Sequence, residues 1–513
     1  MRKPPRTPGP ASATRAALQP LRAHPHLYQI NTWPWLDALS AAAGRSMRLV
    51  DVPDAEWDRL AELGFDCVYL LGIWKRSIAG RRMFRTDPAA FARFDHALPG
   101  WTVESVVGSP FSIEDYTPDP RIGSWSDLDQ VRERLHARGM RLMVDFVPNH
   151  TGPDHPWITT HPDYFMQGSE ADFHRNPSAF LLIEPTGGQP YYVARGRDPY
   201  FAPWADTAQL DYFNPATRAA MLAVLQELGR HVDGLRCDMS MLVLNAVFAR
   251  TWAPLLLGRT APEGEFWSAA VAALPADFLW LAEVYWGMEG ALQSLGFGFT
   301  YDKLLYDRLK GDAAGVYAVL RDDTARQCRM ARFLENHDEE RSVVAFGRER
   351  QTALMVLLAT VPGLRFFHQG QFEGLSMHLP MPLNAALAQT ADAALVAQYQ
   401  RLLRLVDDPV FHDGDWKLLD VTPDSDASHG ALLCWRWQHR DAYRLVVVNL
   451  GSHQAQGRVW IAHELAPGAQ IRLVDGLDGL DGQEYLRARE DLATNGLYVR
   501  LVGNGAHLFT VTV

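Results

Sequence analysis

The sequence is poor in cysteine and carries an excess of negative charge. Its 513 residues include four cysteines, which lie far apart and form no Cys-x-x-Cys pair. This spacing supports neither a disulfide framework nor a zinc site. The formal net charge of -11 argues against binding to a phosphate backbone, which needs clustered lysine and arginine. We therefore expect no nucleic-acid partner.

Long hydrophobic runs are missing as well. The longest, from Thr352 to Val361, is too short to cross a bilayer and is followed by Pro362. Residues 1–25 contain five basic residues but no apolar stretch of the kind that a signal peptide needs. We interpret residues 1–25 as a disordered tail, and we predict a cytoplasmic protein without a membrane partner.

Aromatic residues, by contrast, are frequent, with 16 Trp and 16 Tyr. Sugars offer apolar faces that stack on aromatic rings, although a large protein core needs many aromatic residues for packing alone. The length of the chain suggests two or three domains rather than one.

Helix and strand signals alternate along the chain. A predicted helix begins with Asp54 as its N-cap and ends at Gly64, and a buried strand follows over 67–73. A capping box of Ser126 and Asp129 predicts the next such helix. Helices that alternate with continuously apolar strands indicate a parallel sheet that is covered on both faces.

Eight candidate strands fit this alternation. An α/β fold with a (β/α)8 TIM barrel would place its chemistry at the C-terminal ends of the strands. An open doubly wound sheet is the alternative, but no glycine-rich phosphate fingerprint follows the first strand. We therefore predict the barrel. Its strands are expected to begin near Leu27, Asp66, Arg141, Asp233, Phe278, Phe297, Met330 and Gly363.

Two segments break the alternation. Residues 151–210 are rich in proline and short aromatic runs, and sixty such residues are too many for a simple loop. After residue 409, short β runs separated by Gly, Asp and Ser are typical of an antiparallel β-sandwich. We predict a barrel over 26–150 and 211–409, a separate unit over 151–210 and a C-terminal β domain over 410–513.

Four short segments place charged or polar residues at the end of an apolar run. Burying a charge costs several kcal/mol unless the charge is paired, so four such strand ends suggest a site. The segments are Asp-Phe-Val-Pro-Asn-His at 145–150, Gly-Leu-Arg-Cys-Asp at 234–238, Leu-Ala-Glu-Val-Tyr-Trp at 281–286 and Phe-Leu-Glu-Asn-His-Asp at 333–338.

Together and in this order, the four segments resemble the sequence regions of the α-amylase family of glycosidases and transglycosidases, glycoside hydrolase family 13. The resemblance extends roughly from Tyr28 to Asp408. It implies a TIM barrel in which residues 151–210 form a small domain inserted after the third strand, along one wall of the cleft.

Three acids, Asp238, Glu283 and Asp338, stand at the predicted ends of strands 4, 5 and 7. Cleavage of a glycosidic bond creates positive charge on the sugar ring and negative charge on the departing oxygen. A carboxylate can stabilise the positive charge, and a carboxylic acid can protonate the departing oxygen. The resemblance implies that Asp238 is the nucleophile, Glu283 the general acid and then base, and Asp338 a third carboxylate that binds ring hydroxyls. Taken alone, each acid would more simply close a barrel end as half of an ion pair.

Further residues complete the expected site. Arg236 points to the same side of its strand as Asp238 and is expected to keep that carboxyl ionised, or else to form a structural salt bridge. His150 and His337 resemble paired histidines that bind the hydroxyls of the cleaved sugar, although a lone histidine is more often a core residue. Asp145 matches an aspartate that supports the site.

The chain also departs from the family pattern. Phe111 stands where a stacking tyrosine is common, and it can stack without the hydroxyl. A Lys-His pair that often follows the nucleophile is missing, and Met239, Met241 and Leu242 stand in this region. Since Trp286 follows the predicted acid, we expect a leaving-group side that is rich in stacking surface and poor in charge.

A calcium ion is not expected. Gln209 replaces the aspartate that is associated with calcium in many family members, and Asn149 alone makes no cage for an ion that takes six to eight oxygens. We predict no metal and no cofactor.

These features predict a retaining α-glycoside hydrolase that acts on maltooligosaccharides or related short α-glucans through a covalent glycosyl-enzyme. Its expected partner is a small oligosaccharide. Hydrolysis and transfer share this intermediate, so an α-glucan transglycosidase is the alternative. A non-catalytic carbohydrate-binding barrel is less favoured, because all three acids are present.

Overall fold

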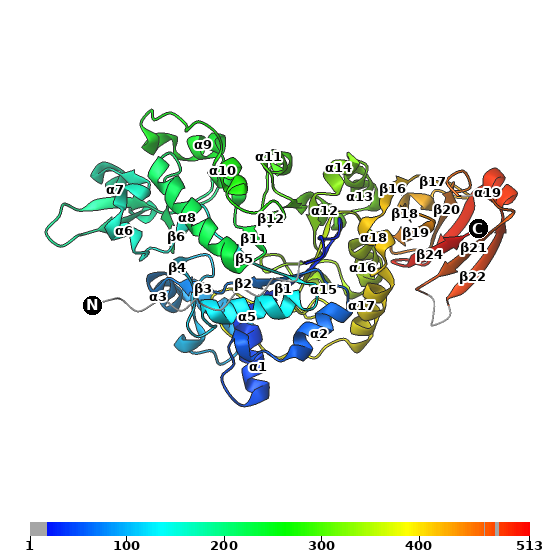
Figure 1. Ribbon diagram of the computed structural model, residues 1–513, viewed down its shortest axis with the longest axis horizontal. Helices are drawn as coiled ribbons and strands as arrows, with labels where there is room; N and C mark the ends of the chain where they lie inside the picture. The colour runs from blue at the N-terminus through cyan, green and yellow to red at the C-terminus, as the bar shows by residue number, and fades with distance from the viewer. Residues whose placement is uncertain (1–17, 466, 478–481) are drawn as a thin grey trace, which may run out of the picture.

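The computed structural model describes residues 18–465, 467–477 and 482–513, and a closed barrel of eight parallel strands forms its centre (Figure 1). Closure confirms the predicted TIM barrel and excludes the open doubly wound sheet. Each strand begins within two residues of its predicted start. In barrel order they are β1 (His26–Asn31), β15 (Leu364–His368), β14 (Met330–Arg332), β13 (Phe299–Tyr301), β12 (Leu279–Ala282), β11 (Gly234–Cys237), β5 (Arg141–Phe146) and β2 (Cys67–Leu71).

Helices surround the barrel and bury the outer faces of its strands. They include α1 (Thr32–Ala43), α2 (Asp54–Glu62), α5 (Trp125–His136), α8 (Pro215–His231), α9 (Asn245–Leu256), α10 (Phe266–Ala272), α11 (Glu289–Ser294), α12 (Lys303–Leu309), α13 (Ala313–Leu320), α14 (Thr324–Gln327), α15 (Ser342–Ala345), α16 (Gln351–Thr360), α17 (Ala393–Val406) and α18 (Pro409–Asp413).

Two predicted caps lie elsewhere. The N-cap of α2 is Pro53 rather than Asp54, which lies within the helix. The capping box of α5 is formed by Ser124 and Asp127, two residues before the predicted pair. In α2 no side chain caps the first turn, whereas in α5 the Ser124 hydroxyl accepts a hydrogen bond from the Asp127 backbone N–H. Several polar residues stand near the start of each helix, so the sequence does not single out one cap.

A two-helix insertion between β2 and α5 was not predicted. It consists of β3 (Trp74–Arg76), α3 (Ile78–Thr86), α4 (Pro88–Ala97) and β4 (Ile113–Pro118), and β3 pairs with β4. Phe94 and Val106 centre a small apolar cluster of its own, which also includes Leu383 from the loop after β15. Its helices are short and its apolar residues few, so the sequence pattern is weak there.

A second insertion follows the third barrel strand, β5, and projects at the left of Figure 1. Its strands β7, β9 and β8 form a small antiparallel sheet, while β6 pairs with β10. Its elements are β6 (His150–Thr151), α6 (Trp157–Thr160), β7 (Gln167–Gly168), α7 (Glu170–Arg175), β8 (Phe180–Ile183), β9 (Tyr191–Ala194) and β10 (Ala208–Gln209).

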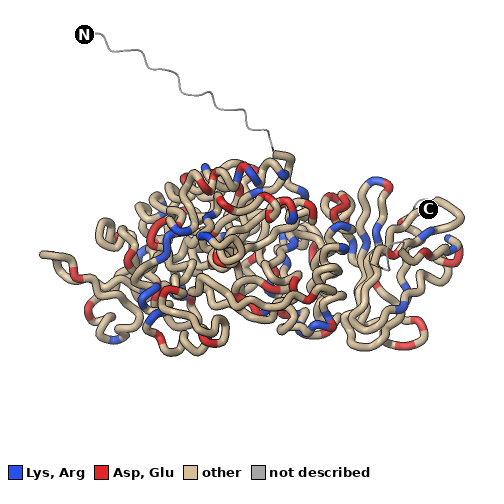
Figure 2. The backbone as a smooth tube through the Cα atoms, turned by 90° about the horizontal axis from the view of Figure 1, so that it is seen from below, with Lys and Arg blue, Asp and Glu red and all other residues tan. Residues whose placement is uncertain are grey.

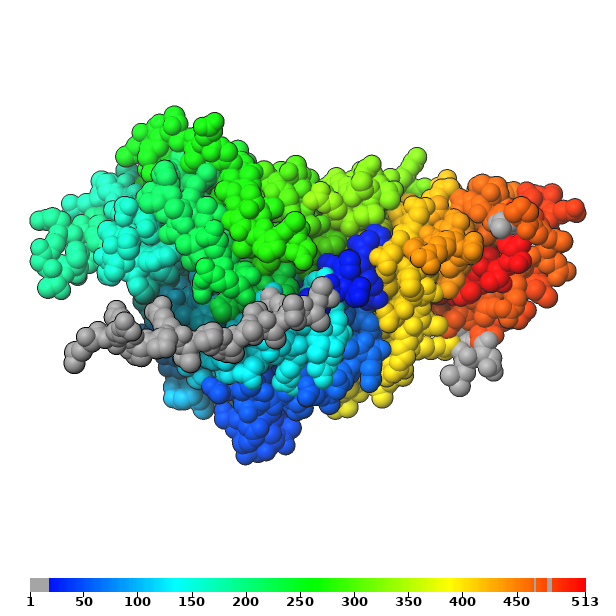
Figure 3. Space-filling model, in the orientation of Figure 1, coloured from blue at the N-terminus to red at the C-terminus, as the bar shows by residue number. Residues whose placement is uncertain are grey.

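The C-terminal part is an antiparallel β domain, as predicted. Six strands form one sheet and three form the other, and the space-filling view places this part at the end of the molecule opposite the β5 insertion (Figure 3). Its elements are β16 (Asp415–Leu419), β17 (Val421–Thr422), β18 (Leu432–His439), β19 (Ala442–Asn449), β20 (Ala455–Val459), β21 (Gln470–Asp475), β22 (Gln483–Ala488), α19 (Arg489–Asn495), β23 (Leu497–Leu501) and β24 (Ala506–Thr512). The domain boundaries given above stay predictions.

The segment before β1 differs from the expected tail. Residues 1–17 of that prediction lie outside the described part of the chain, but the last residues of 1–25 are held in place. Arg22 lies 2.7 Å from the Asp66 carboxylate and also contacts Asp407, and the buried His24 donates its backbone N–H to the His412 carbonyl. These partners are distant in sequence, so no local pattern predicts them.

The surface carries charges of both signs. Basic and acidic residues are interspersed along the barrel and the C-terminal domain (Figure 2). Within the described ranges, no helix combines the length and apolar character that crossing a membrane requires.

Candidate active site

The barrel register brings the motifs of β5, β11 and β12 to one level. Arg236 on β11 lies opposite Asp145 on β5, and Cys237 lies opposite Ala282 on β12. The next residues, Asp238 and Glu283, therefore leave adjacent strand ends side by side. The fourth motif follows β14 on the same rim of the barrel, as parallel strands require.

One buried guanidinium joins two of the acids. Arg236 Nη1 lies 2.7 Å from Asp238 Oδ1, and its Nη2 lies 2.7 Å from Glu283 Oε2. All three side chains are almost completely withdrawn from solvent. Because one cation faces two carboxyls, their full ionisation would leave an excess negative charge in the barrel.

Burial and the charge of Arg236 act on Asp238 in opposite directions. Burial raises the pKa of Asp238 well above its ordinary value, and the charge of Glu283 acts in the same direction, while Arg236 opposes both. Arg236 thus acts in the expected direction and lowers the pKa of Asp238, but burial outweighs it. Like charges in a buried site favour retention of one proton between them. A pair that holds one proton can supply both a carboxylic acid and a carboxylate.

Glu283 has two further partners, which the sequence analysis missed. The Tyr285 hydroxyl donates to Glu283 Oε1 at 2.8 Å, and the Met239 backbone N–H donates to Oε2 at 2.8 Å. Burial and the charge of Glu283 raise the pKa of Tyr285 well above its ordinary value, so this hydroxyl remains a donor. Tyr285 lies in the loop after β12, and its place in the same short motif as Glu283 is the signal that could have suggested it.

Asp338 is the exposed member of the three acids, with 45% of its side chain accessible. Desolvation opposes its ionisation, but His337, Arg236 and His378 together lower the pKa of Asp338 to about 2. It is thus a carboxylate at any ordinary pH. Its Oδ2 lies 3.0 Å from His337 Nε2, and its exposed part can accept further hydrogen bonds. His378 was also missed; its ring lies 3.0 Å from the His337 carbonyl.

The rings of Phe111 and His337 lie next to each other beside Arg236. Their rings are 5.4 Å apart, and the Phe111 ring centre lies 5.2 Å from the Arg236 guanidinium carbon. His337 Nδ1 lies 2.9 Å from the Gln29 side-chain amide. Phe111 thus presents an apolar face beside the acids, while its neighbour Ser112 donates to the Asp206 carbonyl at 2.6 Å and holds the second insertion.

Asp145 and His150 are both buried. Asp145 accepts hydrogen bonds from the Tyr69 hydroxyl and from the Gly72 backbone N–H, the latter at 2.7 Å, so both carboxylate oxygens are used within the protein. It therefore supports the site from behind. His150 packs 5.3 Å from the Trp204 ring, and burial lowers the pKa of His150 to about 4, which keeps its imidazole neutral.

The residues at the position of a family calcium site do not fit that ion. The Gln209 side-chain N–H2 donates to three oxygens, Asn149 O at 2.9 Å, Asn149 Oδ1 at 3.1 Å and Leu210 O at 3.0 Å. Calcium binds through oxygen, and here an amide donor already engages the oxygens that would turn toward a cation. No group of three or more His, Cys, Asp and Glu side chains suited to a metal is found in the described ranges.

We expect EDTA to leave activity and melting temperature unchanged. Gln209→Asp would replace the amide by a carboxylate among carbonyl oxygens. Its melting temperature should fall in EDTA, because a buried unsatisfied group costs about 1–3 kcal/mol, and should recover with calcium. The control Gln209→Leu should be destabilised without a calcium response. A calcium-dependent melting temperature in the wild type would contradict this prediction.

The backbone is constrained just beyond both catalytic candidates. Met239 and Trp286 have left-handed φ values of 40° and 63°, which non-glycine residues rarely adopt. Trp286 is 37% exposed and its ring meets Tyr200 edge to face at 5.0 Å. Met241 and Leu242 are buried and only pack the barrel.

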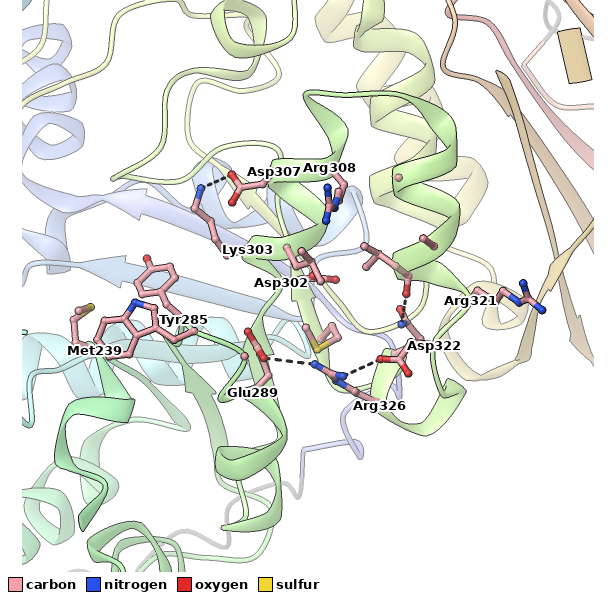
Figure 4. A pocket seen from close by; sticks show the side chains of 18 of the residues that line it. Met239, Tyr285, Glu289, Asp302, Lys303, Asp307, Arg308, Arg321, Asp322 and Arg326 are labelled. Atoms are coloured by element: carbon pink, nitrogen blue, oxygen red, sulfur yellow. Dashed lines mark hydrogen bonds and ion pairs between the residues drawn. The ribbon is translucent and has the colours of Figure 1, made fainter. Parts of the chain in front are cut away.

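Met239, Tyr285 and Trp286 line one end of a cavity of about 1250 Å³, which Figure 4 shows from close by. Beyond this apolar end, charged residues such as Lys303 and Arg326 line the cavity. The expected leaving-group side, rich in stacking surface and poor in charge, stays a prediction. Most of the charged residues come from α11 to α14 and the turns between them, and Asp198 comes from the insertion after β5. The sequence did not indicate that these segments approach one another.

Comparison with known proteins agrees with this architecture. The family described as alpha amylase, catalytic domain, matches residues 56–252. Alpha-amylase MalA of Haloarcula japonica is 24% identical over 58% of this chain, and trehalose synthase/amylase TreS of Mycobacterium tuberculosis is 22% identical over 42%. The aligned parts span only 43% and 32% of these two relatives.

Solved structures extend the likeness to nearly the whole chain. The α-amylase of Geobacillus thermoleovorans, solved in complex with acarbose, superposes with a TM-score of 0.67 at 18% identity. The match covers 96% of this chain and 100% of that one. At this level of identity the likeness concerns the fold.

Proposed function

Because the chain belongs to the α-amylase family of glycosidases and transglycosidases, we propose that it is a retaining α-glycoside hydrolase for maltooligosaccharides or related short α-glucans. The observation that carries this proposal is the Arg236 guanidinium, which contacts both Asp238 and Glu283 at 2.7 Å beside the exposed carboxylate of Asp338. A shared proton on the buried pair provides an acid and a nucleophile.

In the proposed first step, a carboxylate oxygen of Asp238 bonds to the anomeric carbon as the glycosidic C–O bond breaks. Glu283 gives its proton to the departing oxygen. In the second step Glu283 takes a proton from water, and the water oxygen displaces Asp238 from the same carbon. Two displacements at one carbon retain its configuration. Arg236 stays paired with both carboxyls throughout.

The other site residues have supporting roles in this proposal. Asp338, ionised at working pH, accepts hydrogen bonds from ring hydroxyls and stabilises the positive charge on the sugar in the transition state. His150 and His337 bind further hydroxyls, and the Phe111 ring stacks beneath the sugar. Trp286 stacks on the leaving-group side.

Tyr285→Phe should slow natural substrates more than activated ones. The variant loses the hydrogen bond to Glu283 Oε1, and a hydrogen bond to a charged group is worth about 1.5–3 kcal/mol. We expect kcat on maltooligosaccharides to fall roughly tenfold to hundredfold. Aryl α-glucosides with good leaving groups need less protonation and should be affected less.

Tyr212→Phe serves as the control, since it removes a buried hydroxyl that donates to the Pro148 carbonyl, away from the acids. Tyr212→Phe should lower the stability of the protein without changing the ratio of kcat on maltooligosaccharides to kcat on aryl α-glucosides. An equal loss on both substrate classes in Tyr285→Phe would mean that Tyr285 only packs the site.

Glycosyl transfer is the second candidate function. The exposed rings of Trp286 and Tyr200 beside the leaving-group position favour it, because a stacked sugar can meet the glycosyl-enzyme before water does. A product profile on maltooligosaccharides at low and high sugar concentration distinguishes the two. We expect hydrolysis at low concentration, transfer products at high concentration and weak action on insoluble starch.

Release of nitrophenol from aryl α-glucosides is the simplest test of activity. A protein that binds maltooligosaccharides but releases no nitrophenol or reducing sugar would instead be a non-catalytic carbohydrate-binding barrel.

A further inference from the structure

A second hollow lies behind the loop that carries Tyr200. It has a volume of about 300 Å³ and opens between this loop, in the insertion after β5, and the middle of α9. Apart from the ring of Tyr200, the reaction proposed above uses none of its residues. Two arginines and no acidic residue line the hollow, whose lining consists of Arg197, Pro199, Tyr200, Arg250, Thr251 and Pro254.

The hollow adjoins the leaving-group side of the candidate active site. The loop of Tyr200 separates it from the larger cavity of Figure 4, which Asp198 of the same loop lines. The Tyr200 ring meets the Trp286 ring at 5.0 Å, and the Arg250 guanidinium carbon lies 5.7 Å from the centre of the Tyr200 ring. Trp286, Tyr200 and Arg250 therefore form a continuous row from the leaving-group side to the hollow.

The two guanidinium groups have neutral partners. Arg197 Nη2 donates to the Thr251 carbonyl at 2.7 Å, and its guanidinium carbon lies 4.9 Å from the centre of the Trp252 ring. Its buried Nε has no hydrogen-bond partner among the described residues. Arg250 Nη2 lies 3.4 Å from the Tyr200 hydroxyl. Within the ranges that the structure describes, neither arginine forms an ion pair.

The acid next to Arg197 in sequence is engaged elsewhere. Asp198 Oδ1 accepts hydrogen bonds from the backbone N–H groups of Tyr200 and Phe201, at 2.6 and 2.8 Å. Burial lowers the pKa of Arg197, and the charge of Asp198 opposes this effect. Because a partly buried cation is costly without a close counter-charge, an anion that enters the hollow would be stabilised there.

The chemistry of the lining selects an oxyanion. A guanidinium presents parallel N–H donors that match the oxygens of a phosphate or a carboxylate. The volume is at the lower end of the ~300–1,000 Å³ of small-molecule sites, so the hollow accommodates an anionic group with few further atoms. The two prolines and the tyrosine ring offer an apolar wall to the rest of such a ligand.

We propose that Arg197 and Arg250 bind an oxyanion, a phosphate or a carboxylate, that is carried by the sugar on the leaving-group side of the bond. The inference rests on the proposed function and adds to it a preference for an anionic leaving group or acceptor. In transfer, a hydroxyl oxygen of the anionic sugar bonds to the anomeric carbon as the bond to Asp238 breaks. Glu283 takes the hydroxyl proton, and the oxyanion holds the acceptor without entering the reaction.

Binding of three sugars that differ in charge tests the site without requiring turnover. Glucose 6-phosphate carries a phosphate, glucuronate carries a carboxylate and glucose carries neither. Their Kd values are measured by calorimetry on the wild type, Arg197→Gln and Arg250→Gln. Arg250 is exposed, so its replacement carries little risk to folding. The matched control is Arg93→Gln, which replaces an exposed arginine on α4 in the other insertion.

We expect one of the two anionic sugars to bind the wild type roughly tenfold more tightly than glucose, and the tighter one identifies the anion. This preference should disappear in Arg197→Gln and Arg250→Gln and persist in Arg93→Gln. Equal binding of all three sugars by the wild type, or a preference that persists in both variants of the hollow, would overturn the proposed site and leave the proposed function intact.

Inorganic phosphate provides a further probe. If it binds as tightly as glucose 6-phosphate, the arginines bind free anions without any link to the sugar, and the proposal is wrong. Absence of nitrophenol release from aryl α-glucosides would overturn the proposed function, whereas the calorimetry would still decide whether the oxyanion site exists.

Discussion

Asp238→Asn should abolish turnover while the protein remains folded. No covalent intermediate can form, so kcat should fall by at least the ~10²–10⁴-fold that one acid–base group contributes. Arg236 keeps its contact with Glu283 in this variant, so no buried charge loses every partner. Activity is measured on maltooligosaccharides and aryl α-glucosides, and folding by circular dichroism and melting temperature. Retention of more than a tenth of wild-type activity would refute the assignment of Asp238.

Azide distinguishes the roles of the two buried acids. In Asp238→Ala, azide can take the place of the missing nucleophile and attack the anomeric carbon of an activated α-glucoside, which gives β-glucosyl azide. In Glu283→Ala, Asp238 still forms the intermediate, and azide then displaces it to give α-glucosyl azide. If the two variants gave the opposite anomers, the roles of Asp238 and Glu283 would have to be exchanged.

The second large effect expected is a steep loss of stability below pH 6.5. His24, His26 and His412 lie buried at the base of the barrel, close to the guanidinium groups of Arg22 and Arg365. Burial and Arg365 lower the pKa of His24 to about 3 and the pKa of His412 to about 2, and burial also lowers the pKa of His26 well below its ordinary value.

The sign follows from proton binding. A histidine whose pKa is lowered on folding stays neutral in the native state, while the unfolded chain takes up a proton below pH 6.5. Stability is therefore complete above that pH and falls as the pH decreases, by about 1.4 kcal/mol per histidine and pH unit. For three histidines this amounts to about 7 kcal/mol between pH 6.5 and 4.5, which is comparable with the whole stability of a domain.

Melting temperatures from pH 7.5 to 4.5 test this prediction. Buried carboxyls with a raised pKa, such as Asp145, make the protein more stable as the pH falls, which is opposite to the effect of the histidines. The contribution of the histidines is therefore best measured as the difference between a histidine variant and the wild type. His412→Gln should show a flatter pH dependence than the wild type, whereas replacement of the exposed His174 should not. Parallel curves for His412→Gln and the wild type would contradict the prediction.

The barrel can be predicted from the sequence because its strands are buried on both faces. Continuous apolar runs such as 67–73 can pack only in a covered sheet, and the polar residues that end them mark the rim of the barrel. The strand ends therefore also predict that Asp238 and Glu283 lie together, since parallel strands share one rim.

Other features depend on contacts that no local pattern contains. The two-helix insertion after β2 has short helices and a small core, and the anchoring of Arg22 uses partners more than forty residues away. The net direction of the Asp238 pKa required the balance of burial, Arg236 and Glu283 in three dimensions. Tyr285 was overlooked because its hydroxyl reaches back to the acid from a loop.

Trapping of the glycosyl-enzyme tests the central claim most directly. A fluorinated glucosyl fluoride that forms the intermediate faster than it loses it should increase the mass of the protein by one fluoroglucosyl group. Peptide mapping by mass spectrometry then identifies the labelled residue. The account predicts a single adduct on Asp238, formed in the wild type and missing in Asp238→Asn. An adduct on another residue, or full turnover of the reagent without any adduct, would contradict it.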